Sequence, residues 1–337
     1  MSAVSLALGS YTPATGGRGR GLALVRWDGA RLSKLSELDA NSPSFLTWGA
    51  DGRILYAVEE TSVGRILAVS AARDRLAPLN ALTIDSARPC QLALHPSGRL
   101  LTASCYGGGA FVTTVIGDDG ALERRGTGVQ HAGRGPHPTR QDRAHPHAVV
   151  FTPDGARALL LDLGTDTISL HTVTSEGIRP EPIVVARSES GSGPRHALWI
   201  DDGVLAVVEE ITATVTLFRI TETDITRLGP AVATTADADP GAWPSEIAAN
   251  GGVIAVANRT PGSIVELTPQ EGALRVEREI PLPPGANPRH FTVLPDRNYI
   301  LALQDADQVV VMDRDGRILS SLPLGSPSCV AIRPEGR

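Results

Sequence analysis

The chain is organised in short runs in which apolar and polar residues alternate with a period of two. Pairs of such runs flank a polar or glycine-containing turn, as after the segment Gln91-Leu92-Ala93-Leu94. Alternation with this period is typical of a half-buried strand, and two such runs around a short turn predict a β-hairpin. Each unit opens with a proline. The copies begin at Pro43, Pro89, Pro146, Pro194, Pro244, Pro288 and Pro327.

The spacing of these prolines indicates the kind of repeat. Successive prolines are 46, 57, 48, 50, 44 and 39 residues apart, close to the ~40–50 residues of a four-stranded propeller blade. Helical repeats of this length would need a period of about 3.6 residues, whereas these units alternate with a period of two. We therefore predict an all-β fold, a seven-bladed β-propeller with four-stranded antiparallel blades, formed by a single domain over residues 1–337.

The seventh unit supplies only one strand, within residues 327–334. Apolar runs at residues 5–10, 21–26 and 32–35 can provide the second, third and fourth strands of the same blade. Pairing both ends of the chain in one blade removes an exposed strand edge, which is a hazard for β-sheets. We therefore expect the ring to be closed by this composite blade.

One segment interrupts the pattern. Residues 129–147, VQHAGRGPHPTRQDRAHPH, show no apolar periodicity and account for the longest interval between prolines. A long connection without regular structure is usually functional or disordered. Because this segment leads directly into the first strand of a blade, we predict a functional loop that lines a site.

Composition and charge exclude several classes of function. The net charge of −6 and an aromatic content of 4% argue against a nucleic-acid-binding protein, which usually carries a basic stripe and stacking residues. No run approaches the ~20 apolar residues that a membrane span needs, and the first residues lack the basic start of a secretory signal. The three cysteines show no metal or disulfide spacing. We expect a cytoplasmic protein without nucleic-acid or membrane partners.

Charged residues recur where a propeller would bring them together. The first strand of each blade lines the central channel, so its start and the end of the second strand lie near one mouth, where ligand sites collect. The first-strand candidates are His145, His147, Arg195, His196, Glu246, Arg289 and His290. The second-strand candidates are Glu59, Glu60, Asp162, Glu209, Glu210, Asn258, Arg259 and Gln304. Arginine, histidine and glutamate together suit an anionic substrate and acid–base chemistry. The alternative is that these ions pair between blades and only stabilise the fold.

Searches for other chemistry are negative. The chain has no G-x-S-x-G, P-loop, G-x-G-x-x-G or H-E-x-x-H motif. Gly107-Gly108-Gly109 is interpreted as a tight turn between strands, because no helix pattern follows it. The histidines of the long loop match no common metal-ligand spacing, so we predict no metal and no cofactor.

With these residues identified, the chain resembles the 6-phosphogluconolactonase family of seven-bladed propellers, which also includes carboxy-cis,cis-muconate cyclases. The resemblance covers nearly the whole chain and rests on the order and spacing of short segments. These segments include Gly9-Ser10-Tyr11-Thr12, Tyr56-Ala57-Val58-Glu59-Glu60, Tyr106-Gly107-Gly108-Gly109, Arg140-Gln141 with His145-Pro146-His147, Asp162-Leu163-Gly164, Pro194-Arg195-His196, Glu209-Glu210-Ile211, Ser245-Glu246, Asn258-Arg259 and Pro288-Arg289-His290.

The resemblance implies specific site residues. The family's proposed active-site positions fall on His147, Arg195, Glu210 and Arg259, which we expect to be catalytic. The expected substrate-binding residues are Arg140, Gln141, His145, Glu60, Tyr106, Asp162, Glu246, Arg289 and Gln304. The sequence departs from the family where Asn-Glu is usual, with Glu59-Glu60 and Glu209-Glu210, and where Ala-Asn-Tyr is common, with Ser104-Cys105-Tyr106.

These observations lead to three functional hypotheses. The first is hydrolysis of a sugar-acid lactone, 6-phosphoglucono-1,5-lactone to 6-phosphogluconate in the pentose phosphate pathway, by a monomer or weak homo-oligomer. His147 or Glu210 would act as general base, and Arg195 or Arg259 would stabilise the oxyanion. The second is lactone formation by a muconate-type cyclase. The third is a non-catalytic propeller that binds a partner at its mouth.

Overall fold

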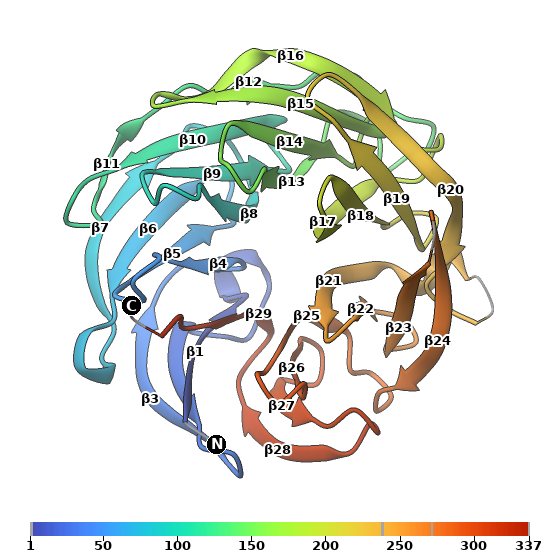
Figure 1. Ribbon diagram of the computed structural model, residues 1–337. Coiled ribbons are helices and arrows are strands. Elements are labelled where there is room, and N and C mark those ends of the chain that lie inside the picture. The colour runs from blue at the N-terminus through green and yellow to red at the C-terminus, as the bar shows by residue number, and fades with distance from the viewer. Residues whose placement is uncertain (1–2, 237–238, 271, 336–337) are drawn as a thin grey trace.

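The computed structural model describes residues 3–236, 239–270 and 272–335, and these form seven antiparallel sheets arranged in a ring (Figure 1). In each blade the first strand is innermost and the later strands lie progressively outward. Blade 1 contains β4 (Leu46–Trp48), β5 (Ile54–Glu59), β6 (Arg65–Ser70) and β7 (Ala77–Thr83). Blade 2 contains β8 (Pro89–Leu94), β9 (Leu100–Cys105), β10 (Ala110–Ile116) and β11 (Leu122–Arg125), with the additional short β12 (Val129–Gln130) paired to β10. Blade 3 contains β13 (Pro146–Phe151), β14 (Arg157–Asp162), β15 (Thr167–Thr174) and β16 (Gly177–Arg187).

Blades 4 to 6 have the same order, and blade 7 joins both ends of the chain. Blade 4 contains β17 (Pro194–Asp201), β18 (Val204–Glu209), β19 (Thr214–Ile220) and β20 (Ile225–Ala233). Blade 5 contains β21 (Pro244–Asn250), β22 (Val253–Asn258), β23 (Ser263–Gln270) and β24 (Ala273–Pro281). Blade 6 contains β25 (Pro288–Val293), β26 (Tyr299–Leu303), β27 (Gln308–Met312) and β28 (Ile318–Pro323). Blade 7 contains β29 (Pro327–Ile332), β1 (Val4–Ser10), β2 (Gly21–Trp27) and β3 (Leu32–Asp39).

The ring closes as the sequence predicts. Strand β1 pairs with β29 on one side, where Leu8 is opposite Val330, and with β2 on the other, where Leu8 is opposite Ala23. The innermost strands also contact their neighbours around the ring, including β29 with β4. The predicted seven-bladed propeller, with its composite blade, is therefore confirmed.

The core lies between neighbouring blades rather than inside one layer. Every residue of the second strand β18 (VLAVVE) is buried, whereas the outermost strand β7 is almost entirely exposed. This gradient explains why the second strand of each unit is a nearly continuous apolar run, since its two faces pack against two different blades. Two tryptophan side chains also make hydrogen bonds between neighbouring blades. The indole N–H of Trp48 donates to the Ala331 carbonyl, and that of Trp199 donates to the Phe151 carbonyl. Among the described residues, no helix is long and apolar enough to span a membrane.

A backbone feature recurs at the start of most blades. In six blades the residue before the repeated proline has a left-handed conformation; these residues are Ser42, Arg88, Gly193, Trp243, Asn287 and Ser326. In blades 2 to 7 the pairing register shifts at the residue that follows the proline, which is a β-bulge. A bulge leaves one residue unpaired and redirects its side chain. In these six blades the bulge thereby places the residue after the proline at the mouth of the channel.

Blades 5 and 6 are joined by a buried glutamate away from this mouth. Glu266 accepts hydrogen bonds from Arg278 at 2.9 and 3.1 Å, from Arg314 at 3.0 Å and from the Tyr299 hydroxyl at 2.5 Å. Burial alone would raise the pKa of Glu266, but the hydrogen bonds from Arg278, Arg314 and Tyr299 lower it to about 2. A carboxylate whose pKa is lower in the folded state stabilises the fold at pH values above its unfolded pKa.

Substitution of this carboxylate should therefore destabilise the protein in a pH-dependent way. We expect Glu266→Gln to lower the free energy of unfolding at pH 7 by about 2 kcal/mol, the range of a hydrogen bond to a charged group. The difference from the wild type should shrink as the pH falls from about 5 toward 2, because the wild type also loses this charge. Urea unfolding at pH 7 and at pH 4 measures both values. Equal stability at pH 7, or a difference that does not change with pH, would contradict the prediction.

Candidate active site

Two sets of equivalent side chains surround one mouth of the channel. The first-strand ring consists of the residues that follow the repeated prolines: Ser44, Cys90, His147, Arg195, Ser245, Arg289 and Ser328. The second-strand ring consists of the residues that follow the second strands: Tyr11, Glu60, Tyr106, Leu163, Glu210, Arg259 and Gln304. The first strand starts beside the end of the second, as where Pro194 pairs with Glu209. Both rings therefore lie at the same mouth.

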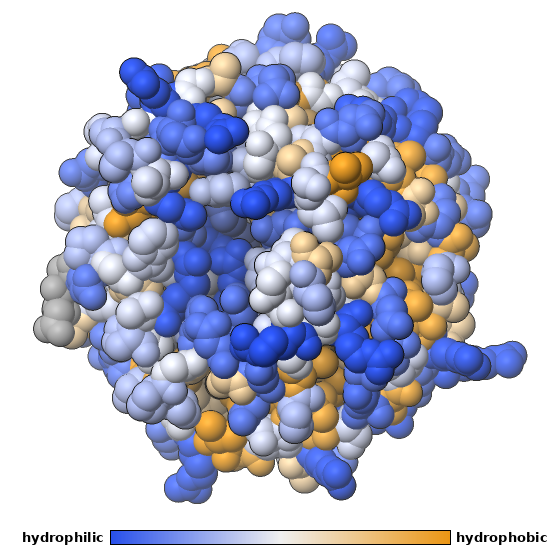
Figure 2. Space-filling model, turned by 180° about the vertical axis from the view of Figure 1, so that it is seen from behind, coloured by the Kyte–Doolittle hydropathy of each residue, from blue (hydrophilic) through white to orange (hydrophobic). Residues whose placement is uncertain are grey.

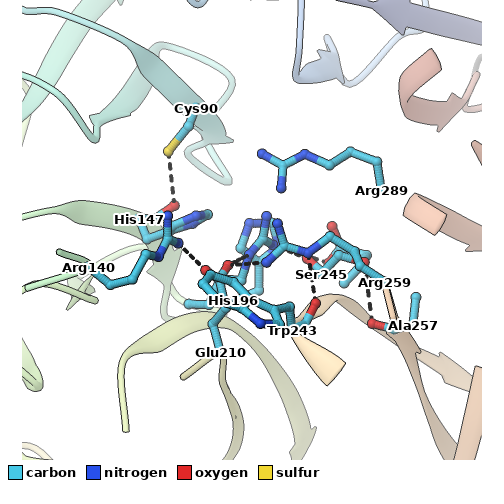
Figure 3. A network of polar contacts seen from close by, with 12 residues as sticks. Cys90, Arg140, His147, His196, Glu210, Trp243, Ser245, Ala257, Arg259 and Arg289 are labelled. Carbon is cyan, nitrogen blue, oxygen red and sulfur yellow. Dashed lines mark hydrogen bonds and ion pairs between the residues drawn. The ribbon is translucent and has the colours of Figure 1, made fainter. Parts of the chain in front are cut away.

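Glu210 is the centre of an ion-pair cluster in this mouth (Figure 3). Its Oε2 accepts a hydrogen bond from Arg195 Nε at 2.6 Å and lies 2.9 Å from Arg259 Nη2. Its Oε1 pairs with Arg140, which comes from the long loop. Arg195 also donates to the Ser245 carbonyl. Glu210 and Arg195 are 1% and 3% exposed, so these charges are held in fixed positions away from bulk water.

The arginine side chains around Glu210 determine whether its carboxyl group is protonated. Burial alone would raise the pKa of Glu210, but the guanidinium groups of Arg259, Arg195 and Arg140 outweigh that effect and hold the pKa far below its ordinary value. Burial lowers the pKa of Arg259 to about 10, which still leaves the group charged at neutral pH. Glu210 is thus a carboxylate, and a very weak base, under all physiological conditions.

His147 is the neutral partner in this cationic mouth. It occupies the bulge position of β13 and is 4% exposed, and its ring makes edge contacts with Tyr106 and His196 at centroid distances of 5.9 and 5.3 Å. Burial, followed by the nearby charge of Arg195, holds its pKa well below 6.5. Its buried Nδ1 has no hydrogen-bond partner among the described residues. A neutral imidazole with an unengaged ring nitrogen is suited to accept a proton from water.

A second buried group lies behind His147. Glu246 Oε1 bonds to His196 Nδ1 at 2.9 Å, and its Oε2 lies 3.1 Å from His290 Nε2. Burial lowers the pKa of both imidazoles, that of His290 to about 4. Glu246 therefore orients His196, whose ring packs against His147. This contact gives Glu246 a supporting position in the channel wall.

A polar cavity of about 630 Å³ opens beside the cluster. Its wall includes Tyr11, Glu60, Arg88, Arg259, Arg289 and Gln304. Arg289 donates to the Tyr11 hydroxyl at 2.9 Å, and that hydroxyl donates to Glu60 at 3.1 Å. Burial is the main reason that the pKa of Tyr11 rises to about 12, so Tyr11 stays neutral. Figure 2 shows a hydrophilic hollow at the centre of the face that is hidden in Figure 1.

The long loop is ordered by internal hydrogen bonds and delivers Arg140 to the mouth. Gln141 is fully buried and donates to the Leu163 carbonyl at 2.8 Å and to Asp166 at 2.6 Å. Asp162 accepts from the His145 backbone N–H at 2.8 Å and pairs with His131 at 2.8 Å. The interpretation of this segment as a loop that lines a site agrees with its Arg140–Glu210 contact.

The structure separates the candidate residues into two groups. Those at the cluster or the cavity are His147, Arg195, Glu210, Arg259, Arg140, Arg289, Glu60 and Gln304, with Tyr106 and His145 stacked beside them at a centroid distance of 4.1 Å. Gln141, Asp162 and Glu246 instead direct their polar atoms at other parts of the chain. These hydrogen bonds favour a role for the three in holding the loop and His196 in place, and their part in substrate binding stays a prediction.

Sequence reasoning missed two residues at this mouth. Tyr11 belongs to the second-strand ring of the composite blade, and its position would follow from the same strand-end rule that selects Glu210. Trp243 precedes a repeated proline, and its ring contacts two guanidinium groups of the cluster, those of Arg140 and Arg259. The available signal was a tryptophan at a position where the other blades have Ser, Arg, His, Gly or Asn.

The donor set of the mouth differs from that of a metal site. Among residues 3–236, 239–270 and 272–335, no group of three or more His, Cys, Asp or Glu side chains is arranged to hold a metal ion. The predominant charged groups are guanidinium groups, which bind anions and not cations.

The comparisons assign this propeller to a class of protein. A family model described as Lactonase, 7-bladed beta-propeller, matches residues 5–332, and the chain therefore belongs to the family of seven-bladed propeller lactonases. The predicted enzyme class, a lactone-hydrolysing carboxylic-ester hydrolase, is confirmed at the level of this family.

Several relatives of the chain agree with the predicted resemblance. The 6-phosphogluconolactonase of Bacillus subtilis is 25% identical over 309 residues, which cover 86% of each chain. A provisionally named 6-phosphogluconolactonase of Arthroderma benhamiae is 31% identical over 189 residues, and the match spans about half of that relative, 48% of its length. The crystal structure of a candidate 6-phosphogluconolactonase from Bacteroides fragilis has a TM-score of 0.89 at 25% identity and covers 98% of each chain. The periplasmic gluconolactonase of Pseudomonas aeruginosa shares the fold, with a TM-score of 0.86 at 24% identity over 99% of each chain.

Proposed function

We propose that the mouth cluster hydrolyses 6-phosphoglucono-1,5-lactone to 6-phosphogluconate, without a metal or cofactor. The observation that carries the proposal is the convergence of a neutral, buried His147 with the guanidinium groups of Arg195, Arg259 and Arg289. Hydrolysis of a lactone phosphate needs cations for the phosphate and for the developing oxyanion, together with a base that is unprotonated near pH 7. The names of the bacterial and fungal relatives support this substrate.

Each residue at the mouth has its own role in the proposed hydrolysis. His147 takes a proton from a water molecule whose oxygen attacks the lactone carbonyl carbon, and Arg195 or Arg259 stabilises the tetrahedral oxyanion. Collapse of this intermediate breaks the bond to the ring oxygen, which receives the proton from His147. The new carboxylic acid then loses its proton to solvent. Arg289, at the cavity wall, is placed to bind the phosphate.

The sequence left open whether His147 or Glu210 is the general base, and the surroundings of Glu210 favour another role for it. Three guanidinium groups pair with its carboxylate oxygens and hold its pKa far below the ordinary value, whereas the buried Nδ1 of His147 has no hydrogen-bond partner among the described residues. We assign general-base catalysis to His147 and the fixing of the three arginines to Glu210. The ion pairs of Glu210 therefore do more than stabilise the fold, because they also hold the arginine side chains that we propose to be catalytic.

The test is acid release from freshly prepared 6-phosphoglucono-1,5-lactone, measured by pH-stat titration against spontaneous hydrolysis. We expect acceleration that EDTA does not reduce, and a lower kcat/KM for glucono-1,5-lactone, which lacks the phosphate. No acceleration with either lactone would contradict the proposal, and EDTA-sensitive turnover would contradict its metal-free form. Conversion of a carboxymuconate to a lactone, without lactone hydrolysis, would instead support the cyclase alternative. A role in the cytoplasmic pentose phosphate pathway follows only if the phosphorylated lactone is preferred.

A further inference from the structure

Trp243 occupies a backbone position that does not suit its side chain. It precedes Pro244 and has φ 51° and ψ 63°, in the left-handed region. Five other blades have the same left-handed conformation before the proline, at Ser42, Arg88, Gly193, Asn287 and Ser326. Glycine and asparagine tolerate it well, and Trp243 is the one aromatic residue among the six. A bulky aromatic residue with positive φ is an outlier, and such outliers persist mainly where they serve a function.

The contacts of Trp243 indicate what its ring does. The guanidinium carbons of Arg140 and Arg259 lie 5.0 and 5.6 Å from the ring centroid (Figure 3). The Trp243 carbonyl accepts a hydrogen bond from Arg259 Nε at 2.7 Å. Tyr106 also contacts the Arg140 guanidinium, at 5.5 Å. Distances of this size are those of cation–π interactions.

The two arginines reach Glu210 from separate parts of the chain. Arg140 belongs to the long loop before blade 3, whereas Arg259 follows β22 in blade 5. Both pair with Glu210, and Trp243 is the one residue of the described set that contacts both of their guanidinium groups through its ring. Because long arginine side chains have many rotamers, a shared aromatic contact restricts both to the orientation that serves the anion site.

We propose that Trp243 is a positioning residue that fixes the guanidinium groups of Arg140 and Arg259 around Glu210. This inference rests on the proposed lactonase function for its effect on turnover, but not for its effect on the arginines. The left-handed backbone at this position is common to six blades, and blade 5 differs from the others in placing an aromatic ring there, beside two guanidinium groups.

The test compares Trp243→Gly with Trp243→Phe. Glycine suits the left-handed backbone, so the unfolding temperature of Trp243→Gly should not fall, while kcat/KM should drop by on the order of 10²-fold, the effect of a misplaced catalytic group. Phe keeps an aromatic face and should recover most of the loss. Ser42→Gly introduces glycine at the equivalent position of blade 1, where the native residue is serine and not an aromatic residue. This variant should keep wild-type kcat/KM.

A second measurement does not depend on the reaction. In wild-type protein the Arg140 and Arg259 Nε–H groups should give sharp, slowly exchanging NMR signals, which Trp243→Gly should broaden or lose and Trp243→Phe should retain. Unchanged arginine signals in Trp243→Gly, or kcat/KM within about twofold of wild type, would overturn the proposal. If the wild type has no lactonase activity, the proposed function fails, and the arginine signals alone decide the role of Trp243.

Discussion

Arg195→Ala is expected to lower kcat/KM for lactone hydrolysis by about 10³-fold, the loss that follows removal of one oxyanion-stabilising donor. Arg195 is 3% exposed, and its bonds to Glu210 and the Ser245 carbonyl hold its guanidinium in one orientation before substrate arrives. Glu210 keeps Arg140 and Arg259 as partners in this variant, so the fold should survive. Steady-state rates from the pH-stat assay measure the loss.

Arg278→Ala is the matched control for this substitution. It also removes one arginine from a buried glutamate that retains a second one, since Arg314 still pairs with Glu266. This cluster lies away from the mouth, so kcat/KM should stay near the wild-type value even if the unfolding temperature falls. Similar losses of activity in both variants would show that Arg195 acts through stability, and near-normal activity of Arg195→Ala would refute its catalytic assignment.

His147→Gln is expected to reduce kcat by about 10²–10⁴-fold, the usual contribution of a general base. The wild-type pH profile should also report this group. Because burial and Arg195 hold the pKa of His147 well below 6.5, the base is already neutral at pH 6.5, and kcat/KM should be level between pH 6.5 and 8. It should fall only at lower pH, as His147 becomes protonated. This acidic limb should be absent from the residual activity of His147→Gln.

His171→Gln provides the control for a buried histidine outside the mouth. His171 is 1% exposed, burial lowers its pKa, and both ring nitrogens are engaged, by the Arg179 carbonyl and the Ser169 hydroxyl. Its substitution should leave both kcat and the shape of the pH profile unchanged. A wild-type profile that already declines near pH 6.5 would contradict the neutral-base assignment of His147.

The fold could be predicted because each blade repeats one local pattern. The proline and the apolar second strand recur at intervals of 39 to 57 residues, and blade 7 follows from the unpaired run at residues 327–334. The mouth could be predicted for the same reason, because the residues after the prolines and after the second strands are equivalent in every blade. The candidates at these strand ends include His147, Arg195, Glu210 and Arg259, and the family resemblance singles out these four.

The remaining contacts depend on the loop and on side-chain direction, which repeats do not encode. Arg140 and Gln141 are neighbours in sequence, yet one pairs with Glu210 and the other is buried against Asp166. The contacts of Trp243 could not be predicted, because they involve two guanidinium groups that come together only in the folded ring.

The departures from the family pattern lie in the scaffold. The Glu209 carboxylate accepts hydrogen bonds from Thr214 and Thr216, and Glu59 bonds to the Asn41 backbone N–H and to Arg65. Adjacent residues of an extended strand point in opposite directions, so Glu209 faces its own blade while Glu210 faces the mouth. We therefore expect these changes to leave the substrate class unaltered.

Ring closure brings residues from blades 3 to 6 together at one mouth, which we propose binds the lactone. A crystal structure of the protein with 6-phosphogluconate, the product of the proposed reaction, tests this proposal. We predict ligand density in the cavity lined by Arg259 and Arg289, with the carboxylate within hydrogen-bond distance of Arg195 or Arg259 and the phosphate beside Arg289. Product bound instead in the outer groove between blades 7 and 1, near Asp39 and Asn80, would contradict it.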